Sequence, residues 1–286
     1  MTIDQLLIWS RRELASSDSA SIDANTLLCF VTGKNTAFLY AHGEEFIRQF
    51  EAATFENLVN LRKKGHPIAY LTGSREFWSL DLTVNEDVLI PRHDTELIVE
   101  TLLSVSESLG GTHLSRVLDL GTGSGAIALA AASELPNWEI VGVDISQAAL
   151  RVAEVNQRKL ALANVQFVQG CWYQPLKGTC YEQSKFDIII SNPPYIRKDD
   201  IHLDRGDVRF EPIMALVSDE EGYADLKKII YGSAEFLSPN GWIILEHGFD
   251  QAKEVRRILL DSGFDSIQTH RDLGGNERVT KGRTSV

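Results

Sequence analysis

The chain has 286 residues, of which 43% are hydrophobic, so it is long enough for two domains with buried cores. Its 28 Lys and Arg residues are outnumbered by 40 Asp and Glu residues. The net charge of −12 argues against stable, sequence-independent binding of nucleic acid, because such binding needs a basic surface. Cys29, Cys171 and Cys180 are scattered and form no C-x-x-C pair, which speaks against a disulfide framework or a zinc site. No apolar run approaches the roughly 18 residues of a membrane span, so we expect a cytoplasmic protein without membrane contact.

Helical patterns fill the first part of the chain. Thr2 and Gln5 form a capping box ahead of the first amphipathic stretch. A later stretch, "GEEFIRQFEAATFENLVNLRKKG", carries its large apolar residues near helical spacing. The pattern predicts a small all-helical N-terminal domain over residues 1–66.

The sequence pattern then changes to alternating apolar and polar residues in "EFWSLDLTVNEDVLI". Such alternation is typical of a β-hairpin, and we assign residues 67–93 to a hairpin linker between two domains. A helix is expected next, with Asp94 or Thr95 as its cap.

Residues 94–286 alternate between extended and helical patterns, which predicts an α/β domain with a doubly wound, mostly parallel sheet. Two last extended stretches, near 265–270 and 278–281, are placed to close that sheet with an antiparallel edge. The five strands expected before them are Arg116–Leu120, Glu139–Asp144, Val165–Val168, Phe186–Ser191 and Gly241–Glu246.

A glycine loop follows the first of these strands, in "VLDLGTGSGAIALA". Glycines let the backbone approach a ligand closely, and the helix that follows offers free N–H groups. Gly121, Gly123 and Ala126 also satisfy the dinucleotide fingerprint, so the loop alone leaves a nicotinamide cofactor open. Asp119 favours S-adenosylmethionine, because a carboxylate can receive its ammonium group but would repel a pyrophosphate. We assign to this cofactor the loop residues Gly121, Thr122, Gly123, Ser124 and Gly125.

Two residues at later strand ends are further cofactor candidates. Asp144 can take a ribose hydroxyl, although it can also cap the next helix, a role open to Ser146 instead. Trp172 follows the third strand at the carboxyl edge, where sheets of this kind bind ligands, and on residues alone it fits the core as well as an adenine contact. We interpret Cys171 as a bystander, since no His is adjacent to it in the sequence.

The fourth strand ends in Asn192-Pro193-Pro194-Tyr195. The prolines lack N–H groups and fix φ, so the segment is a rigid loop with unpaired carbonyls. The Asn192 side chain and the Pro193 carbonyl provide two acceptors for a planar –NH2 group, and Tyr195 offers a face for a flat group. Two acceptors hold such a nitrogen facing a methyl donor and favour its more positive transition state. We therefore predict that Asn192 and Pro193 are catalytic and that all four residues bind substrate, without a metal.

In order and spacing, "DLGTGSG", "VD" and "NPPY" resemble class I S-adenosylmethionine-dependent methyltransferases that act on planar nitrogens, DNA adenine methyltransferases included. The chain from about Pro67 onward also resembles the peptide chain release factor glutamine methyltransferases of the HemK type, and its helical N-terminal part has a matching size. The segments that carry this resemblance are "PIAYLTGSREFWSLDLTV", "LIPRHDTELIVE", "GDVRFEPIMALV", "ILEHGFDQ" and "RDLGGNERVT".

The resemblance implies methylation of the glutamine in the Gly-Gly-Gln loop of class-1 release factors, with S-adenosylmethionine as cofactor. It assigns the glycine loop, Asp144 and Trp172 to the cofactor, and the Asn-Pro-Pro-Tyr loop to the substrate glutamine, with Asn192 also near the methyl group. His93 stands where the family usually has Pro, and Cys171 stands where it often has Asp or Ser. Arg92 and Glu211 either orient the loop or the partner, or form a structural ion pair.

Three alternatives stay open at this point. One is a ribosomal-protein glutamine methyltransferase with the same core. Another is an N6-adenine nucleic-acid methyltransferase, which predicts a basic face and salt-dependent affinity that the net charge does not favour. The third is a nicotinamide-dependent dehydrogenase, a chemistry that gives no role to Asn-Pro-Pro-Tyr.

Overall fold

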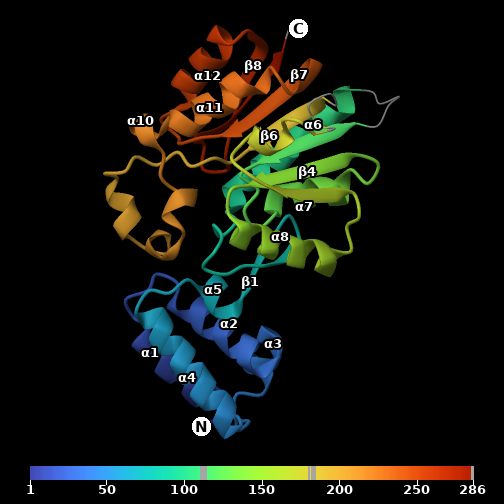
Figure 1. Cartoon of the computed structure of the whole chain (residues 1–286). Helices are drawn as coiled ribbons and strands as arrows, with labels where there is room; N and C mark the ends of the chain where they lie inside the picture. Colours follow the sequence, from blue (N-terminus) through green and yellow to red (C-terminus); the bar gives the residue numbers. More distant parts are fainter. Residues whose placement is uncertain (110–114, 180, 182–184, 285–286) are drawn as a thin grey trace. The chain divides into compact units, whose positions relative to one another are not determined.

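The computed structural model describes residues 1–109, 115–179, 181 and 185–284 (Figure 1). It divides into two compact units. The helical unit consists of Met1–Ser74 with His202–Phe210, and the α/β unit of Arg75–Ile201 with Glu211–Val286. Within the described ranges, no helix is both long and apolar enough to cross a membrane.

The helical unit packs amphipathic helices around one apolar core, which confirms the all-helical N-terminal domain. Thr2 and Gln5 form the expected capping box at the start of the first helix. Residues 68–72, which the sequence assigned to the hairpin linker, form a further short helix of this unit. The helices are α1 (Ile3–Glu13), α2 (Ala20–Thr32), α3 (Thr36–Ala41), α4 (Gln49–Lys63) and α5 (Ile68–Thr72).

The segment His202–Phe210 belongs to the helical unit although it follows the Asn-Pro-Pro-Tyr loop in the chain. The Arg62 guanidinium of α4 lies 3.0 Å from the Asp207 carboxylate. Arg209 of the same segment donates to the Lys64 carbonyl at 3.1 Å. Nothing in the sequence pattern indicated this partnership, because it joins residues 145 positions apart.

A two-stranded hairpin opens the α/β unit. Its strands, β1 (Ser74–Phe77) and β2 (Leu80–Thr83), are shorter than the predicted linker 67–93. Trp78 and Ser79 make the turn with φ values of 52° and 58°. The Trp78 backbone N–H donates to the Glu96 carboxylate at 3.0 Å, and this bond ties the turn to the start of α6 (Glu96–Ser108).

The main sheet has seven strands in the order β5-β4-β3-β6-β7-β9-β8. Strands β3 to β7 run parallel, and β9 is antiparallel to both of its neighbours. The doubly wound, mostly parallel fold class and its antiparallel edge are therefore confirmed. The strands are β3 (Arg116–Leu120), β4 (Glu139–Asp144), β5 (Val165–Gln169), β6 (Phe186–Ser191), β7 (Leu237–Glu246), β8 (Phe264–Arg271) and β9 (Glu277–Thr284).

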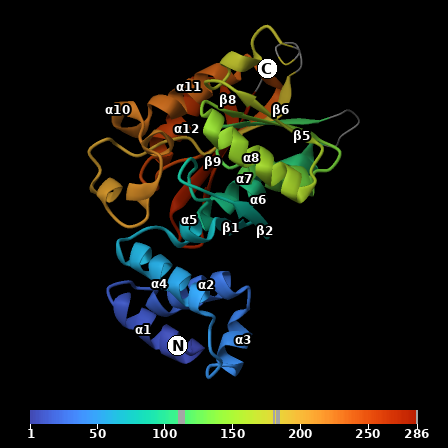
Figure 2. The same cartoon turned by 60° about the horizontal axis from the view of Figure 1, so that its bottom comes forward.

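Helices cover both faces of this sheet, as the residues of β6 demonstrate. Ile188 and Ile190 pack with α6 and α7, whereas Ile189 between them packs with α11 and α12 (Figures 1 and 2). Successive side chains of a strand point to opposite faces, so an uninterrupted apolar run suits a strand buried on both sides. The helices of this unit beyond α6 are α7 (Ala126–Glu134), α8 (Gln147–Leu160), α10 (Asp219–Gly222), α11 (Ala224–Ser233) and α12 (Ala252–Asp261).

Candidate active site

The carboxyl ends of four parallel strands surround a cavity of about 300 Å³ in the α/β unit. The glycine loop follows β3, Asp144 ends β4, Trp172 follows β5 and Asn192 follows β6, so the topology brings four separate motifs to one edge of the sheet. The sequence-predicted residues that line this cavity are Gly121, Gly123, Asp144, Trp172, Asn192 and Pro194. Among the described residues, five other candidates do not form its wall: Thr122, Ser124, Gly125, Pro193 and Tyr195.

The glycine loop adopts a backbone that side chains disfavour. Gly121, Gly123 and Gly125 have φ values of 76°, 57° and 81°. At Gly125, the N-cap of α7, an added Cβ would also lie 3.0 Å from Leu129 and 3.1 Å from Phe167. The loop is therefore tight, and its glycines bring backbone rather than side chains to the cavity.

Asp119 lies directly before this loop and is completely buried. Its Oδ2 accepts a hydrogen bond from the Thr122 hydroxyl at 2.6 Å, whereas its Oδ1 has no hydrogen-bond partner among the described residues. Burial, with a smaller contribution from the Asp144 charge, raises the pKa of Asp119 to about 7. A buried carboxylate with a free oxygen fits a cationic ligand group, as the ammonium of S-adenosylmethionine is.

Both carboxylate oxygens of Asp144 accept backbone hydrogen bonds. Oδ2 accepts from Gly123 N–H and Oδ1 from Ser146 N–H, each at 2.8 Å. The Ser146 hydroxyl accepts from Ala149 N–H at 3.1 Å and so caps α8. Each Asp144 oxygen keeps a second lone pair, and these remain for ribose hydroxyls of a ligand in the cavity.

The Trp172 ring lies beside the glycine loop in the wall of the cavity. Its ring lies 3.5 Å from the position that a Cβ on Gly121 would take. Its backbone has a φ of 49°, which is strained for a bulky residue. Such backbone strain persists only where the surroundings impose it, which makes this turn after β5 a candidate functional position.

Three hydrogen bonds to residues of other segments hold the Asn-Pro-Pro-Tyr loop. The Asn192 side chain donates its Nδ2–H to the Thr95 hydroxyl oxygen at 3.3 Å. The Tyr195 hydroxyl donates to Glu246 Oε1 at 3.2 Å, and Gln251 donates its Nε2–H to the Tyr195 carbonyl at 3.2 Å. Since Nδ2 of Asn192 is engaged, its Oδ1 is the atom left to accept from a ligand.

Arg92 and Glu211 form a structural ion pair within this unit. Arg92 Nη2 lies 2.5 Å from Glu211 Oε2, and the other oxygen of Glu211 accepts from Ile90 N–H at 3.2 Å. Glu211 is buried, whereas His93 beside this pair is exposed and lies 3.5 Å from Glu96. The pair therefore joins "IPRHDTE" to "RFEP" and leaves the His93 ring at the surface.

Sequence reasoning missed several residues of the site. Thr95, Glu246 and Gln251 support the Asn-Pro-Pro-Tyr loop, and their only signal was their place in "LIPRHDTELIVE" and "ILEHGFDQ". Leu89 lies in "LIPRHDTELIVE", and Pro212, Met214 and Ala215 lie in "GDVRFEPIMALV", but no reasoning from the sequence assigned them to the site. Asp87 and Val88 of the predicted hairpin linker also line the cavity, as do Asp225 and Lys228, for which no motif gave a signal. No group of three or more His, Cys, Asp or Glu suited to a metal ion occurs in the described part of the chain.

Comparisons with known proteins agree with this geometry. Residues 112–268 match a family model described as a methyltransferase domain, and residues 5–73 match the PrmC N-terminal domain. The chain is 48% identical to the release factor glutamine methyltransferase of Salmonella typhimurium, over 95% of each chain. It is 44% identical to the protein of that name from Vibrio cholerae, over 99% of this chain and 97% of the relative.

Solved structures share the fold at lower sequence identity. The hMettl16 catalytic domain in complex with an RNA hairpin superposes with a TM-score of 0.59 at 17% identity, over 91% of each chain. The human methyltransferase 10 domain containing protein superposes with a TM-score of 0.54 at 18% identity, over 81% of this chain and 98% of the other. These likenesses show a methyltransferase fold. The family model and the full-length relatives support S-adenosylmethionine as the cofactor. The full-length relatives go further: the chain belongs to the release factor glutamine methyltransferases.

Proposed function

We propose that this enzyme methylates the side-chain amide nitrogen of the glutamine in the Gly-Gly-Gln motif of class-1 peptide chain release factors. The observation that carries the proposal is the Asn192 side chain, which lies in the wall of the cavity with its Nδ2 already bonded to Thr95. Its Oδ1 accepts one hydrogen of the substrate –NH2 group, and the Pro193 carbonyl accepts the other.

The reaction needs little from the protein besides this geometry. S-adenosylmethionine supplies a methyl group on a positively charged sulfur. An amide nitrogen is a poor nucleophile because its lone pair is delocalised into the carbonyl. The two acceptors orient that lone pair and stabilise the positive charge that grows on the nitrogen, and this stabilisation is stronger in the transition state than in the ground state. Transfer would form the new N–C bond as the methyl–sulfur bond breaks, and the amide nitrogen would release one proton to solvent.

Of the residues that we propose for the cofactor, Gly121, Gly123, Asp144 and Trp172 line the same cavity, whereas Asp119 is buried directly before the glycine loop. The backbone of the glycine loop approaches the methionine part of the cofactor, Asp119 receives its ammonium group, Asp144 accepts from its ribose and Trp172 contacts its adenine. Thr122 and Ser124 contribute through backbone and support, since the Thr122 hydroxyl binds Asp119 and the Ser124 carbonyl accepts from Asn156.

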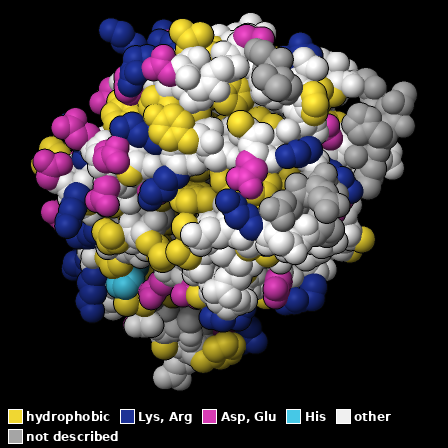
Figure 3. Space-filling model, turned by 45° about the horizontal axis from the view of Figure 1, so that its top comes forward, with side chains coloured by type: hydrophobic (Ala, Val, Ile, Leu, Met, Phe, Trp, Pro, Cys, Tyr) yellow, Lys and Arg dark blue, Asp and Glu magenta, His cyan; other side chains and the backbone are white. Residues whose placement is uncertain are grey.

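Charge favours a protein substrate over a nucleic acid. The net charge is −12, and the face seen in Figure 3 has Lys and Arg side chains interspersed with Asp and Glu rather than gathered into a basic surface. A cytoplasmic location goes with this substrate, since release factors act during translation. Stable binding of nucleic acid is not part of the proposal.

Methyl transfer from labelled S-adenosylmethionine tests the proposal directly. A class-1 release factor should take up label, and the same factor with Gln→Ala in its Gly-Gly-Gln loop should not. Duplex DNA and ribosomal proteins serve as parallel substrates. Label on DNA or on a ribosomal protein, without label on the release factor, would replace the proposal by the N6-adenine or the ribosomal-protein alternative.

A further inference from the structure

We propose that Thr95 and Glu246 are positioning residues for methyl transfer, which act together to keep the Asn192 amide turned with its carbonyl oxygen toward the substrate nitrogen. This inference rests on the proposed function, because an acceptor at Asn192 matters only if the substrate presents an –NH2 group. It also gives a role to the segments "IPRHDTE" and "ILEHGFDQ", which the proposed catalytic and cofactor residues leave unexplained.

The Thr95 side chain does not cap α6, although the place of Thr95 in the chain suggests that it would. It is the N-cap residue of α6, yet its side chain makes no capping hydrogen bond. It is buried, with 4% of its surface exposed, and its Oγ1 accepts the Nδ2–H of Asn192 at 3.3 Å. The hydroxyl thus contributes to the orientation of the Asn192 amide rather than to the helix terminus.

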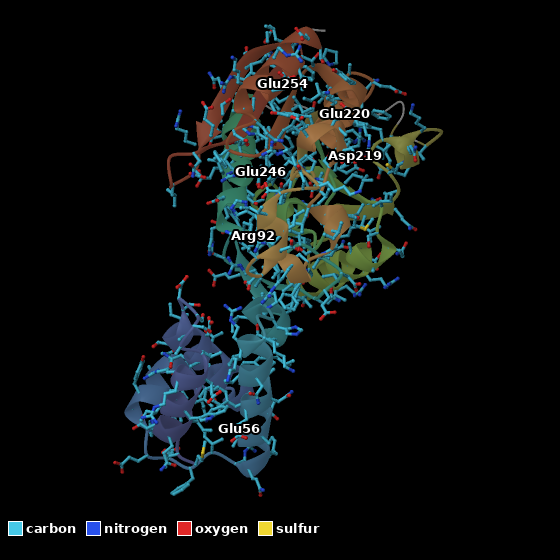
Figure 4. All side chains as sticks on the ribbon, turned by 90° about the vertical axis from the view of Figure 1, so that its left-hand side faces the viewer. Glu56, Arg92, Asp219, Glu220, Glu246 and Glu254 are labelled. Atoms are coloured by element: carbon cyan, nitrogen blue, oxygen red, sulfur yellow. The ribbon has the colours of Figure 1, made fainter. Side chains whose placement is uncertain are left out.

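Glu246 is the last residue of β7 and is labelled in Figure 4. It is 2% exposed; its Oε1 accepts from the Tyr195 hydroxyl at 3.2 Å, and its Oε2 has no hydrogen-bond partner among the described residues. Burial raises the pKa of Glu246 to about 7, and the nearby Thr95 hydroxyl is the largest influence that lowers it. Oε2 of Glu246 is the acceptor assigned to the Thr95 hydroxyl in this proposal, since it has no other partner among the described residues.

The direction of the hydrogen bonds follows from the chemistry of the groups. An ionised carboxylate only accepts, and a hydroxyl has one proton to donate. When Thr95 directs its proton to Glu246, its oxygen lone pairs are left for a donor, and Asn192 can satisfy them only with its –NH2 group. The carbonyl oxygen of Asn192 then points away from Thr95. With the amide reversed, Asn192 would present N–H groups to the substrate –NH2, so one of the two acceptors would be lost, and with it the orientation of the substrate nitrogen.

The choice of a carboxylate at this buried position supports the inference. A glutamine has nearly the same size and would avoid the cost of a buried charge. Because a glutamine amide both donates and accepts, however, it would not impose a direction on the Thr95 hydroxyl. The charged groups around Glu246 are Arg278 of β9, which lowers its pKa, and Asp94 before α6, which raises it.

Replacement of Thr95 tests the inference with a matched control. Thr95→Val keeps the shape and removes the hydroxyl, and it should lower kcat about 10- to 100-fold while the affinity for S-adenosylmethionine stays within about threefold. Thr95→Ser restores the hydroxyl and should recover most of kcat. The control is Thr101→Val, since Thr101 is equally buried in α6 and its hydroxyl donates only to the Leu97 carbonyl. It should leave kcat within about twofold.

Glu246→Gln is the second, independent variant. We expect kcat about tenfold lower at pH 8, together with a melting temperature equal to or above that of the unchanged protein, because a buried charge is removed. At saturating cofactor, kcat of the unchanged enzyme should fall as the pH decreases through about 7, where Glu246 becomes protonated. The variant should lose this acid limb. A purely structural role would lower stability and activity together.

The outcomes distinguish a failure of the proposed function from a failure of the positioning role of Thr95 and Glu246. If the unchanged enzyme does not methylate the release factor, the proposed function fails before any variant is compared. If it does, and Thr95→Val keeps kcat within about twofold or Thr95→Ser loses as much as Val, the positioning role is wrong. If Thr95→Val does not fold, Glu246→Gln decides: unchanged kcat and an unchanged pH profile overturn the inference.

Discussion

The two halves of the cavity, which we propose for the cofactor and for the substrate, are held in place by different means. On the cofactor side, Asp144 accepts N–H groups from residues 21 and 2 positions away, and both donors belong to turns that follow neighbouring parallel strands. On the substrate side, the bonds of Asn192 and Tyr195 join side chains that are 97 and 51 positions apart. The cofactor side is therefore a product of local backbone geometry, whereas the substrate side depends on side chains brought together by the whole sheet. Substitutions should affect the two halves separately.

The largest expected effect is on the substrate side. Asn192→Ala removes an acceptor that is stronger in the transition state, so kcat should fall about 100-fold or more, while affinity for S-adenosylmethionine stays within about tenfold. Turnover with a release factor and calorimetric titration of the cofactor measure the two quantities. Retained turnover would show that Asn192 only shapes the loop.

The next effect belongs to the cofactor side. Asp144→Ala removes an acceptor of ribose hydroxyls and leaves the Gly123 and Ser146 N–H groups unpaired, so affinity for S-adenosylmethionine should fall about 10- to 100-fold. At saturating cofactor, kcat should change by less than about threefold, because the ribose that we assign to Asp144 is not the part of the cofactor that reacts. A fall in kcat with unchanged cofactor affinity would contradict the division of the cavity into two halves.

The pH dependence of cofactor binding sharpens the comparison further. Burial raises the pKa of Asp119 from its ordinary value of 3.8 to about 7. The folded, cofactor-free protein thus holds this proton more tightly than the unfolded chain, so its stability should decline as pH rises from about 4 to about 7 and level off above. A cationic ammonium group needs the ionised form, so affinity should be about tenfold weaker at pH 6 than at pH 8.

Asp119→Asn provides the control for both trends. It should bind S-adenosylmethionine weakly with little dependence on pH, and its cofactor-free form should melt at a higher temperature than the unchanged protein at pH 8. Calorimetric titration and thermal unfolding from pH 5 to pH 9 measure this. An affinity that keeps its tenfold pH dependence in Asp119→Asn would assign the titration to another group, such as Asp144, whose pKa burial also raises.

The same contrast explains what the sequence allowed us to predict. The strands β3, β4 and β6 have the predicted bounds, because each is a short apolar run that ends in a turn or a glycine. Gly121, Gly123 and Asp144 could be predicted to lie together at the cavity for the same reason, since each stands at or just after the end of a predicted strand. Asn192 was found because two prolines after a strand are unusual.

The features that the sequence did not predict depend on contacts between segments that are distant in the chain. Thr95 looked like a helix cap, and only the folded sheet brings it to Asn192. Glu246 looked like the end of a strand, and the association of His202–Phe210 with the helical unit had no local pattern at all. Periodicity describes which face of an element is buried, but it does not identify the partner across that face.

The smallest expected effect tests whether capping and ligand binding are divided between Ser146 and Asp144 as the hydrogen bonds indicate. Ser146→Ala removes the side chain that accepts from Ala149 N–H at the start of α8, and the free energy of unfolding should fall by about 1 kcal/mol. Affinity for S-adenosylmethionine should stay within about twofold, because the Ser146 backbone N–H still holds Asp144. Chemical denaturation and calorimetric titration give both values. Since the cap and the ribose acceptor adjoin each other in one turn, a loss of affinity as large as that of Asp144→Ala would mean that the turn, rather than the Asp144 carboxylate, determines cofactor binding.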